Sequence, residues 1–281
     1  MRLGLMQAES AVLDVDANLS AIEAAAGLAR EGGVDLLVTP ELFPVGYAPY
    51  RLREELDPGK LPGIAQSLLD IARRHEIGLL YSLPELGPPQ GDDLPESRDG
   101  RWRITASLAG ADGRLLTHYV KVHLFGREER EVFTPGTAPP VVVDFCGMRL
   151  GVAVCYDIEF PETARAAALR GARVLLVPTA LGTAYDRIPQ RLIPTRALES
   201  QLYVAYANHS GIEDGFALSG GSVVADPFGD LLAQAGKGAE LLFADLDPKR
   251  VEAARRDVPY LRDRRSDIYR EWGIEDFRPG A

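Results

Sequence analysis

Cysteine, positive charge and long apolar runs are all scarce in this chain of 281 residues. Two cysteines cannot form a disulfide framework and suit a reducing compartment. No run approaches the roughly 18 apolar residues of a membrane span, and the apolar start is too short for a signal peptide. With 31 Lys and Arg against 41 Asp and Glu, the formal net charge of −10 disfavours nucleic acid and anionic lipid. We therefore expect a cytoplasmic protein whose partners include neither a membrane nor a nucleic acid.

The familiar motifs of metal, nucleotide and serine chemistry are also missing. The four histidines lie in no HExxH motif, and the chain has no CxxC motif, so we expect no metal site. GxGxxG, GxxxxGK[ST] and GxSxG are absent, which removes the usual signals for dinucleotides, P-loops and the nucleophile elbow. A cysteine–histidine pair involving His123 or His209 stays open, although no local signature supports it.

What the chain does contain is an alternation of apolar strands and amphipathic helices. Hydrophobic residues make up 46% of the chain, enough for a sizeable core. The patterns predict strands at 3–8, 34–39, 77–83, 173–177, 203–208, 217–225 and 240–245. They predict helices at 16–31, 64–75, 161–170, 189–201 and 248–256. Hairpins are expected at 102–121 and 141–154, and an exposed loop at 84–101.

No linker or change of composition divides the chain, so we expect a single domain over residues 1–256. A polar, arginine-rich tail with several aromatic residues follows at 257–281. The order of elements predicts an α/β fold, either with one mixed sheet or with two sheets packed face to face and helices outside.

Cys155 is the most informative residue, because it follows the buried-type strand 151–154 and precedes a helix that Pro161 can open. Ligands in α/β sheets bind at the carboxyl ends of strands, and a nearby helix start would stabilise a thiolate there. The alternative is a small buried core residue. Cys146, at a hairpin turn, is expected to be structural.

Two further charged residues end apolar strands. Glu41 follows the run 34–40, where partial burial would raise its pKa and suit it to act as a general base, or it is a solvated cap. Lys121 closes the strand 115–121 and is either an oxyanion-stabilising group or a surface lysine with a buried stem. Glu128 lies in the charged run 127–131, whose default interpretation is a solvated face. Without an obvious histidine base, a cysteine nucleophile needs a carboxylate and a cation, and Glu41 and Lys121 fit best.

Three blocks carry a resemblance to a known family: 39–41 (TPE), 119–125 (YVKVHLF) and 154–162 (VCYDIEFPE). In this order and spacing the chain resembles the nitrilase superfamily of carbon–nitrogen hydrolases over essentially its whole length. The resemblance implies a catalytic triad of Glu41, Lys121 and Cys155, with Glu128 at the place of the family's second glutamate. It also implies a four-layer α-β-β-α sandwich of two mixed sheets, assembly into homodimers or larger homo-oligomers, and no metal or organic cofactor.

Within the superfamily, the sequence after Cys155 is similar to amidases that act on small aliphatic or amino-substituted carboxamides. The resemblance then implies a thioester mechanism, with Lys121 and the backbone N–H of Tyr156 holding the oxyanion. We expect Tyr47, Tyr50 and Tyr156 to line the substrate pocket, and Asp186 or Glu159 to meet a substrate cation. The tail at 257–281 is expected to pack on a partner subunit. The alternatives are a nitrilase or N-carbamoyl-amine hydrolase of the same superfamily, or a catalytically silent binding or scaffold protein on this fold.

Overall fold

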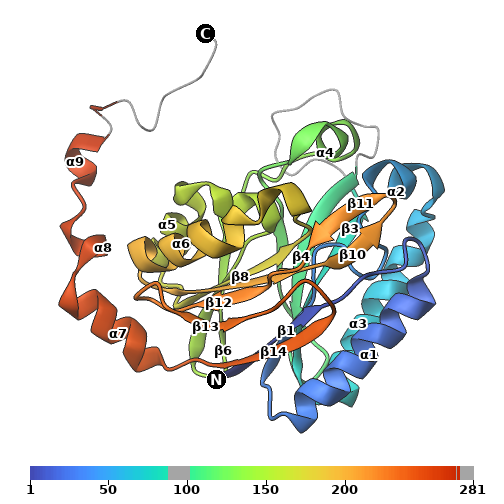
Figure 1. Cartoon of the computed structure of the whole chain (residues 1–281), viewed down its shortest axis with the longest axis horizontal. Coiled ribbons are helices and arrows are strands. Elements are labelled where there is room, and N and C mark those ends of the chain that lie inside the picture. Colours follow the sequence, from blue (N-terminus) through green and yellow to red (C-terminus); the bar gives the residue numbers. More distant parts are fainter. Residues whose placement is uncertain (88–101, 270, 273–281) are drawn as a thin grey trace.

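Two six-stranded sheets lie against one another with helices on their outer faces (Figure 1). The computed structural model describes residues 1–87, 102–269 and 271–272. The first sheet has the strand order β14-β1-β2-β3-β4-β5. Its strands are β1 (Arg2–Gln7), β2 (Leu36–Val38), β3 (Gly78–Leu86), β4 (Trp102–Ala109), β5 (Leu115–Val120) and β14 (Glu240–Asp245). Strands β1, β2 and β3 are parallel and the outer pairings antiparallel, so this sheet is mixed.

The second sheet has the order β13-β12-β9-β8-β7-β6 and is mixed in the same way, with β7, β8 and β9 parallel. Its strands are β6 (Val141–Phe145), β7 (Met148–Val152), β8 (Val174–Thr179), β9 (Tyr203–Asn208), β12 (Val223–Ala225) and β13 (Leu231–Gln234). A separate two-stranded hairpin is formed by β10 (Ser210–Glu213) and β11 (Phe216–Ser219).

Helices cover the outer face of each sheet, α1 and α3 on the first and α5 and α6 on the second (Figure 1). Together with the two sheets they make the four layers expected from the sequence. The helices are α1 (Val15–Glu31), α2 (Pro49–Glu55), α3 (Leu61–Arg74), α4 (Gly126–Val132), α5 (Pro161–Leu169), α6 (Ile193–Ser200), α7 (Pro248–Asp257), α8 (Tyr260–Asp263) and α9 (Ser266–Tyr269). In the described ranges, none of these helices combines the length and apolar character needed to cross a lipid bilayer.

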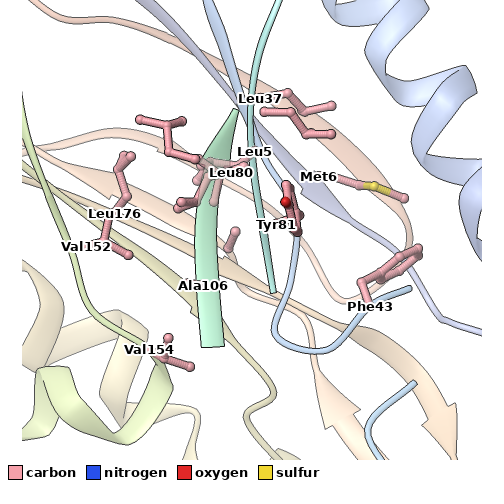
Figure 2. Close-up of a cluster of buried hydrophobic side chains, with 14 of the residues drawn as sticks. Leu5, Met6, Leu37, Phe43, Leu80, Tyr81, Ala106, Val152, Val154 and Leu176 are labelled. Atoms are coloured by element: carbon pink, nitrogen blue, oxygen red, sulfur yellow. The ribbon is translucent and has the colours of Figure 1, made fainter. Parts of the chain in front are cut away.

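The main core lies between the two sheets (Figure 2). Leu5 and Leu80 from the first sheet belong to the same buried cluster as Val152 and Leu176 from the second. Successive strand residues point to opposite faces, so the neighbours of Leu176 in β8 instead join a second cluster beneath α5 and α6. Strands buried on both faces read as continuous apolar runs, which is why the sequence pattern located them.

The expected strand at 217–225 is wrong as a single element. Gly220 and Gly221 have φ values of 63° and 67° and separate β11 from β12. A Cβ atom at Gly220 would lie 2.6 Å from the carbonyl oxygen of Gly236, so this close approach requires glycine. The glycine pair therefore ends the hairpin and begins a strand of the second sheet.

Three other segments differ from the patterns. The run at 34–39 forms only the three-residue strand β2, and 84–86 belong to β3 rather than to the expected loop. Residues 88–101 of that loop lie outside the described ones. The expected helix at 189–201 begins with a turn of π-helix at Ile188–Leu192 before α6. Helix α7 and, in the tail, α8 and α9 extend along one side of the molecule (Figure 1).

Candidate active site

The segments that follow β2, β5 and β7 meet at one edge of the molecule. Strand β5 runs in the same direction as β2, so both carboxyl ends lie at the same edge of the first sheet. The backbone N–H of Glu41, three residues after β2, donates to the carbonyl of Thr179 at the end of β8 in the second sheet at 3.3 Å. This hydrogen bond joins the two sheets where Lys121 and Cys155 also leave their strands.

Lys121 is the centre of the charge network and is fully buried. Its Nζ lies 2.8 Å from Glu41 Oε1 and 2.8 Å from each carboxylate oxygen of Glu129. Burial alone would lower the pKa of this ammonium, but the two carboxylates raise it well above its ordinary value. The two carboxylates therefore stabilise the charged form of Lys121.

The second glutamate that contacts Lys121 is Glu129. The expectation that Glu128 takes this place is therefore corrected. Adjacent residues of a helix point about 100° apart around its axis, and α4 turns Glu129 inward while Glu128 is exposed. Glu129 also accepts the backbone N–H of Phe125 at 2.8 Å, which fixes it at the start of the helix. The sequence held one signal that Glu129 faces inward: it lies three residues before the apolar Val132, which is buried, and residues three apart share one helix face.

Cys155 lies beside the same charges and is buried. Its φ of 47° is rare for a residue with a side chain and places it at the sharp start of a 3₁₀ turn, Cys155–Glu159. Burial raises the pKa of the thiol well above its usual value, the charges of Glu41 and Glu129 raise it further, and Lys121 lowers it. Burial and the two carboxylates thus oppose a resting thiolate, so attack by Cys155 calls for a base that takes the thiol proton.

Glu41 is placed to be that base. Burial raises the pKa of its fully buried carboxyl, Lys121 lowers it, and Glu129 raises it. Oε1 accepts from Lys121, whereas Oε2 has no hydrogen-bond partner of ordinary geometry among the described residues. The Cys155 thiol is near enough to lower the pKa of Glu41 as a hydrogen-bonding neighbour. The free oxygen is available to accept the thiol proton.

A cavity of about 340 Å³ opens next to this network. Its lining includes Tyr47, whose phenol donates to Glu129 Oε1 at 2.6 Å, and the aromatic rings of Phe125 and Phe216. The exposed Glu128 lies in this lining rather than on Lys121. Tyr47 thus connects the cavity with the charged centre.

Tyr50 also lines this cavity and Asp186 lines a different one, while Tyr156 and Glu159 lie beside the site. Tyr156 contacts Phe125 and Phe160 edge-on, with ring centroids 5.2 and 5.0 Å apart, and lines a different cavity of about 460 Å³. Glu159 is half-buried; burial raises the pKa of its carboxyl, while the charges of Arg187, Arg196 and Lys121 lower it. The charge of Lys121 therefore acts on the Glu159 carboxyl, although the two side chains form no ion pair.

The histidines left open as partners of a cysteine are engaged elsewhere. His123 Nδ1 lies 2.8 Å from Asp157, and His209 lies between Glu213 and the backbone carbonyl of Glu41. The contact between His209 and Glu41 was not predicted, because the two residues are 168 positions apart and no local motif marks it. In the described part of the chain, no group of three or more His, Cys, Asp or Glu side chains could hold a metal ion.

Comparisons with known proteins bear on this arrangement. A family model described as carbon-nitrogen hydrolase matches residues 2–256. A protein from Pseudomonas protegens named "Hydrolase in pqqF 5'region" is 38% identical over 274 residues, which cover 96% of this chain and 90% of the relative. An (R)-stereoselective amidase from a Pseudomonas species is 35% identical over 237 residues, covering 83% of this chain and 81% of the relative.

Among solved structures, an amidase from Nesterenkonia sp. AN1 has a TM-score of 0.86 at 42% identity, covering 97% of this chain and 99% of that one. Variants of that amidase have been solved in complex with butyramide and with the acetamide moiety of fluoroacetamide added covalently at the active-site cysteine. The similarity confirms the expected fold of two mixed sheets between helices.

Proposed function

This chain belongs to the carbon–nitrogen hydrolase family, and from that membership we propose that it is an amidase that converts small aliphatic carboxamides to the acid and ammonia. Amidase activity is supported by the names of its relatives. The observation that carries the proposal is the buried Lys121 ammonium held between Glu41 and Glu129 beside the Cys155 thiol. The finer assignment to small aliphatic amides is supported by the small, partly open cavity of about 340 Å³ next to Tyr47, which aromatic rings line.

The first half-reaction forms a thioester. Glu41 takes the proton of the Cys155 thiol while the sulfur bonds to the amide carbon. Lys121 and the backbone N–H of Tyr156 hold the resulting oxyanion, and one such donor is typically worth about 3–4 kcal/mol in the transition state. When the tetrahedral intermediate collapses, the C–N bond breaks and Glu41 returns the proton to the leaving ammonia.

The second half-reaction releases the acid. Glu41, again ionised, takes a proton from water as the water oxygen bonds to the thioester carbon. Collapse breaks the C–S bond, and the proton held by Glu41 returns to the sulfur. Because each step moves a proton between Cys155, Glu41 and the substrate, the total charge of the buried site stays constant. Glu129 keeps Lys121 charged throughout.

We also propose that the protein is a homo-oligomer in which the tail packs on a partner subunit. Val258, Tyr260 and Trp272 have exposed fractions of 49%, 44% and 62%. Apolar and aromatic side chains clustered in one exposed segment are typical of a surface that another molecule covers.

The proposal is tested by ammonia release from a panel of short amides, nitriles and N-carbamoyl amines. We expect turnover of the amides. Carbon dioxide released together with ammonia would support an N-carbamoyl-amine hydrolase instead, and turnover of nitriles alone a nitrilase. No turnover of any compound, together with an unreactive Cys155, would support a silent binding protein.

The nucleophile is tested by Cys155→Ala, which should abolish ammonia release and leave the circular dichroism spectrum unchanged. The matched control is Cys146→Ala at the other free cysteine, which is exposed and should retain wild-type turnover. Glu41→Gln should lose turnover far more than substrate binding, because the variant lacks the base for both half-reactions. Full activity of Cys155→Ala would contradict the mechanism.

A further inference from the structure

A second buried ion pair lies directly behind the proposed base. His209 follows β9 and is fully buried, stacked on Phe43 with ring centroids 5.5 Å apart. Its Nδ1 lies 2.6 Å from Glu213 Oε1, and its Nε2 lies 2.6 Å from the backbone carbonyl oxygen of Glu41. The imidazole therefore joins the hairpin strand β10 to the segment that carries Glu41.

The two partners determine the protonation state of the ring. An ionised carboxylate and a carbonyl oxygen both accept hydrogen bonds and cannot donate them. Two such contacts at 2.6 Å require a hydrogen on each ring nitrogen, so His209 is an imidazolium. Glu213 is kept ionised by further donors, the backbone N–H groups of Ser10 at 2.9 Å and Tyr47 at 2.8 Å.

The electrostatics of the pair agree with this geometry. Burial would lower the pKa of His209, but the charges of Glu213 and Glu41 and hydrogen bonds to both residues raise it. Burial raises the pKa of Glu213, but His209 and the donors around it lower the pKa to about 2. The largest electrostatic contributions to the raised pKa of His209 come from Glu213 and Glu41.

The pair holds the active site from two sides. His209 donates to the backbone of Glu41, which is the base, and Glu213 accepts from the backbone of Tyr47, whose phenol donates to Glu129. Both carboxylates around Lys121 are thus tied to the same buried charges. Such a pair removes freedom from Glu41, and a 1 Å misplacement of a reacting group can cost about a hundredfold in rate.

We infer that the His209 imidazolium, anchored by Glu213, is a positioning group that holds the Glu41 carboxylate in line with the Cys155 thiol. It touches neither substrate nor sulfur, so it acts only through Glu41. The inference rests on the proposed function for the role of Glu41 as the base.

Two substitutions at His209 separate the two contacts. The amide nitrogen of Gln reaches about as far as Nε2, so His209→Gln retains a donor to the Glu41 carbonyl and loses the contact with Glu213. The shorter His209→Asn retains a donor near Nδ1 for Glu213 and loses the contact with Glu41. Both variants remove the positive charge beside Glu213, but only the Gln variant also removes the side-chain hydrogen bond, so we expect the Gln variant to be the less stable.

The expected orders of stability and activity are therefore opposite. His209→Asn should lower kcat by about tenfold or more with little change in KM, while the less stable His209→Gln should retain most of the activity. A purely structural role would make kcat follow stability, and that result would overturn the inference. So would a folded His209→Asn variant with wild-type kcat.

The control is His75→Asn, at a second histidine–carboxylate pair; like His209→Asn, it removes a contact made through Nε2. His75 Nε2 lies 2.7 Å from Glu23 Oε1, at the end of α3 and away from the site. This variant should retain wild-type kcat. A loss of activity as large as that of His209→Asn would show that disrupting any such pair lowers kcat, and would overturn the inference.

Two measurements do not depend on amide turnover. The rate of Cys155 alkylation by iodoacetamide, followed by peptide mass spectrometry, should fall in His209→Asn and recover in His209→Gln. Nitrogen-resolved NMR of wild-type His209 near neutral pH should show both ring nitrogens protonated; a singly protonated ring would overturn the inference. If the wild type releases no ammonia, the proposed function fails, while these two measurements still test the positioning of Glu41.

Discussion

Lys121 shows why the residues of this site cannot be altered independently. An ammonium buried between two carboxylates offsets its loss of hydration only while both partners remain charged. Removing one partner leaves an uncompensated charge in a medium that screens it weakly. The pKa values of Lys121, Glu41 and Cys155 then shift together, because closely coupled groups titrate as a unit.

We predict that Glu129→Gln lowers kcat far more than Glu128→Gln. The first variant loses a charge in direct contact with Lys121, and we expect a loss of about 10²–10³-fold, the range seen when one stabilising group of an oxyanion site is removed. The second changes an exposed side chain at the cavity. The measurement is steady-state ammonia release by both variants, with thermal unfolding as the control for folding. Equal losses would contradict the assignment of Glu129.

The raised pKa of Glu41 predicts where activity falls in acid. Glu41 can accept the thiol proton only when ionised, and its pKa is raised above the ordinary value of 4.5. As the pH falls, protonation of Glu41 therefore removes activity at a pH above 4.5. Lys121 stays charged in this range, because its pKa is well above 10.5. The acid limb of the pH profile of kcat/KM measures the pH at which activity is half lost. A midpoint at or below 4.5 would contradict the raised pKa of Glu41.

How much of the site the sequence predicts depends on where each residue lies. Glu41, Lys121 and Cys155 follow apolar strands, and the carboxyl ends of strands are where α/β folds place their sites. Glu129 lies inside a charged run, where only the rotation of the helix decides which carboxylate faces inward. The contact between His209 and the Glu41 carbonyl arises from the packing of the two sheets, which no local sequence pattern predicts.

At the scale of elements, one buried carboxylate connects the turn after β7 with the segment after β5. Asp157 accepts from the backbone N–H groups of Val122 and His123 at 3.2 and 2.8 Å, and from Val154 at 3.1 Å. It also accepts the phenol of Tyr119 at 2.9 Å. The residues on either side of Lys121 and Cys155 are therefore held by a single side chain.

We predict that Asp157→Asn lowers both stability and kcat. An amide offers one acceptor oxygen where the carboxylate offers two, so buried donors lose their partner at a cost of about 1–3 kcal/mol. Urea unfolding measures the change in the free energy of unfolding, and ammonia release measures kcat. The control is Asp144→Asn, since Asp144 is 84% exposed and lies 3.6 Å from Arg149. If both variants match the wild type, Asp157 does not hold these elements together.

Helices and strands with a long hydrophobic periodicity were predicted from the sequence. Those whose ends depend on backbone dihedral angles were missed. Helix α1 follows the apolar spacing of 16–31 closely. The break at Gly220 was missed because the apolar residues continue on both sides of it, and only the positive φ ends the strand. Helix α4 was missed because seven mostly charged residues carry no apolar stripe.

At the scale of the whole molecule, the tail makes a prediction about assembly. If Tyr260 and Trp272 lie against a partner subunit, light scattering of the intact protein should give a multiple of its 30.5 kDa mass. Tyr260→Asp combined with Trp272→Asp should shift the mass toward the monomer. Leu28→Asp, at a similarly exposed leucine on α1, is the control and should not change the mass. A wild-type monomer at all concentrations would contradict the proposal.

The three groups of the proposed triad come from different halves of the sandwich. Glu41 and Lys121 follow strands of the first sheet, and Cys155 follows a strand of the second. An intermediate with a single sheet formed therefore contains an incomplete set of reacting groups. During refolding, ammonia release should return only after the two sheets have docked, so that enzymatic turnover reports completion of the native state rather than collapse of the chain.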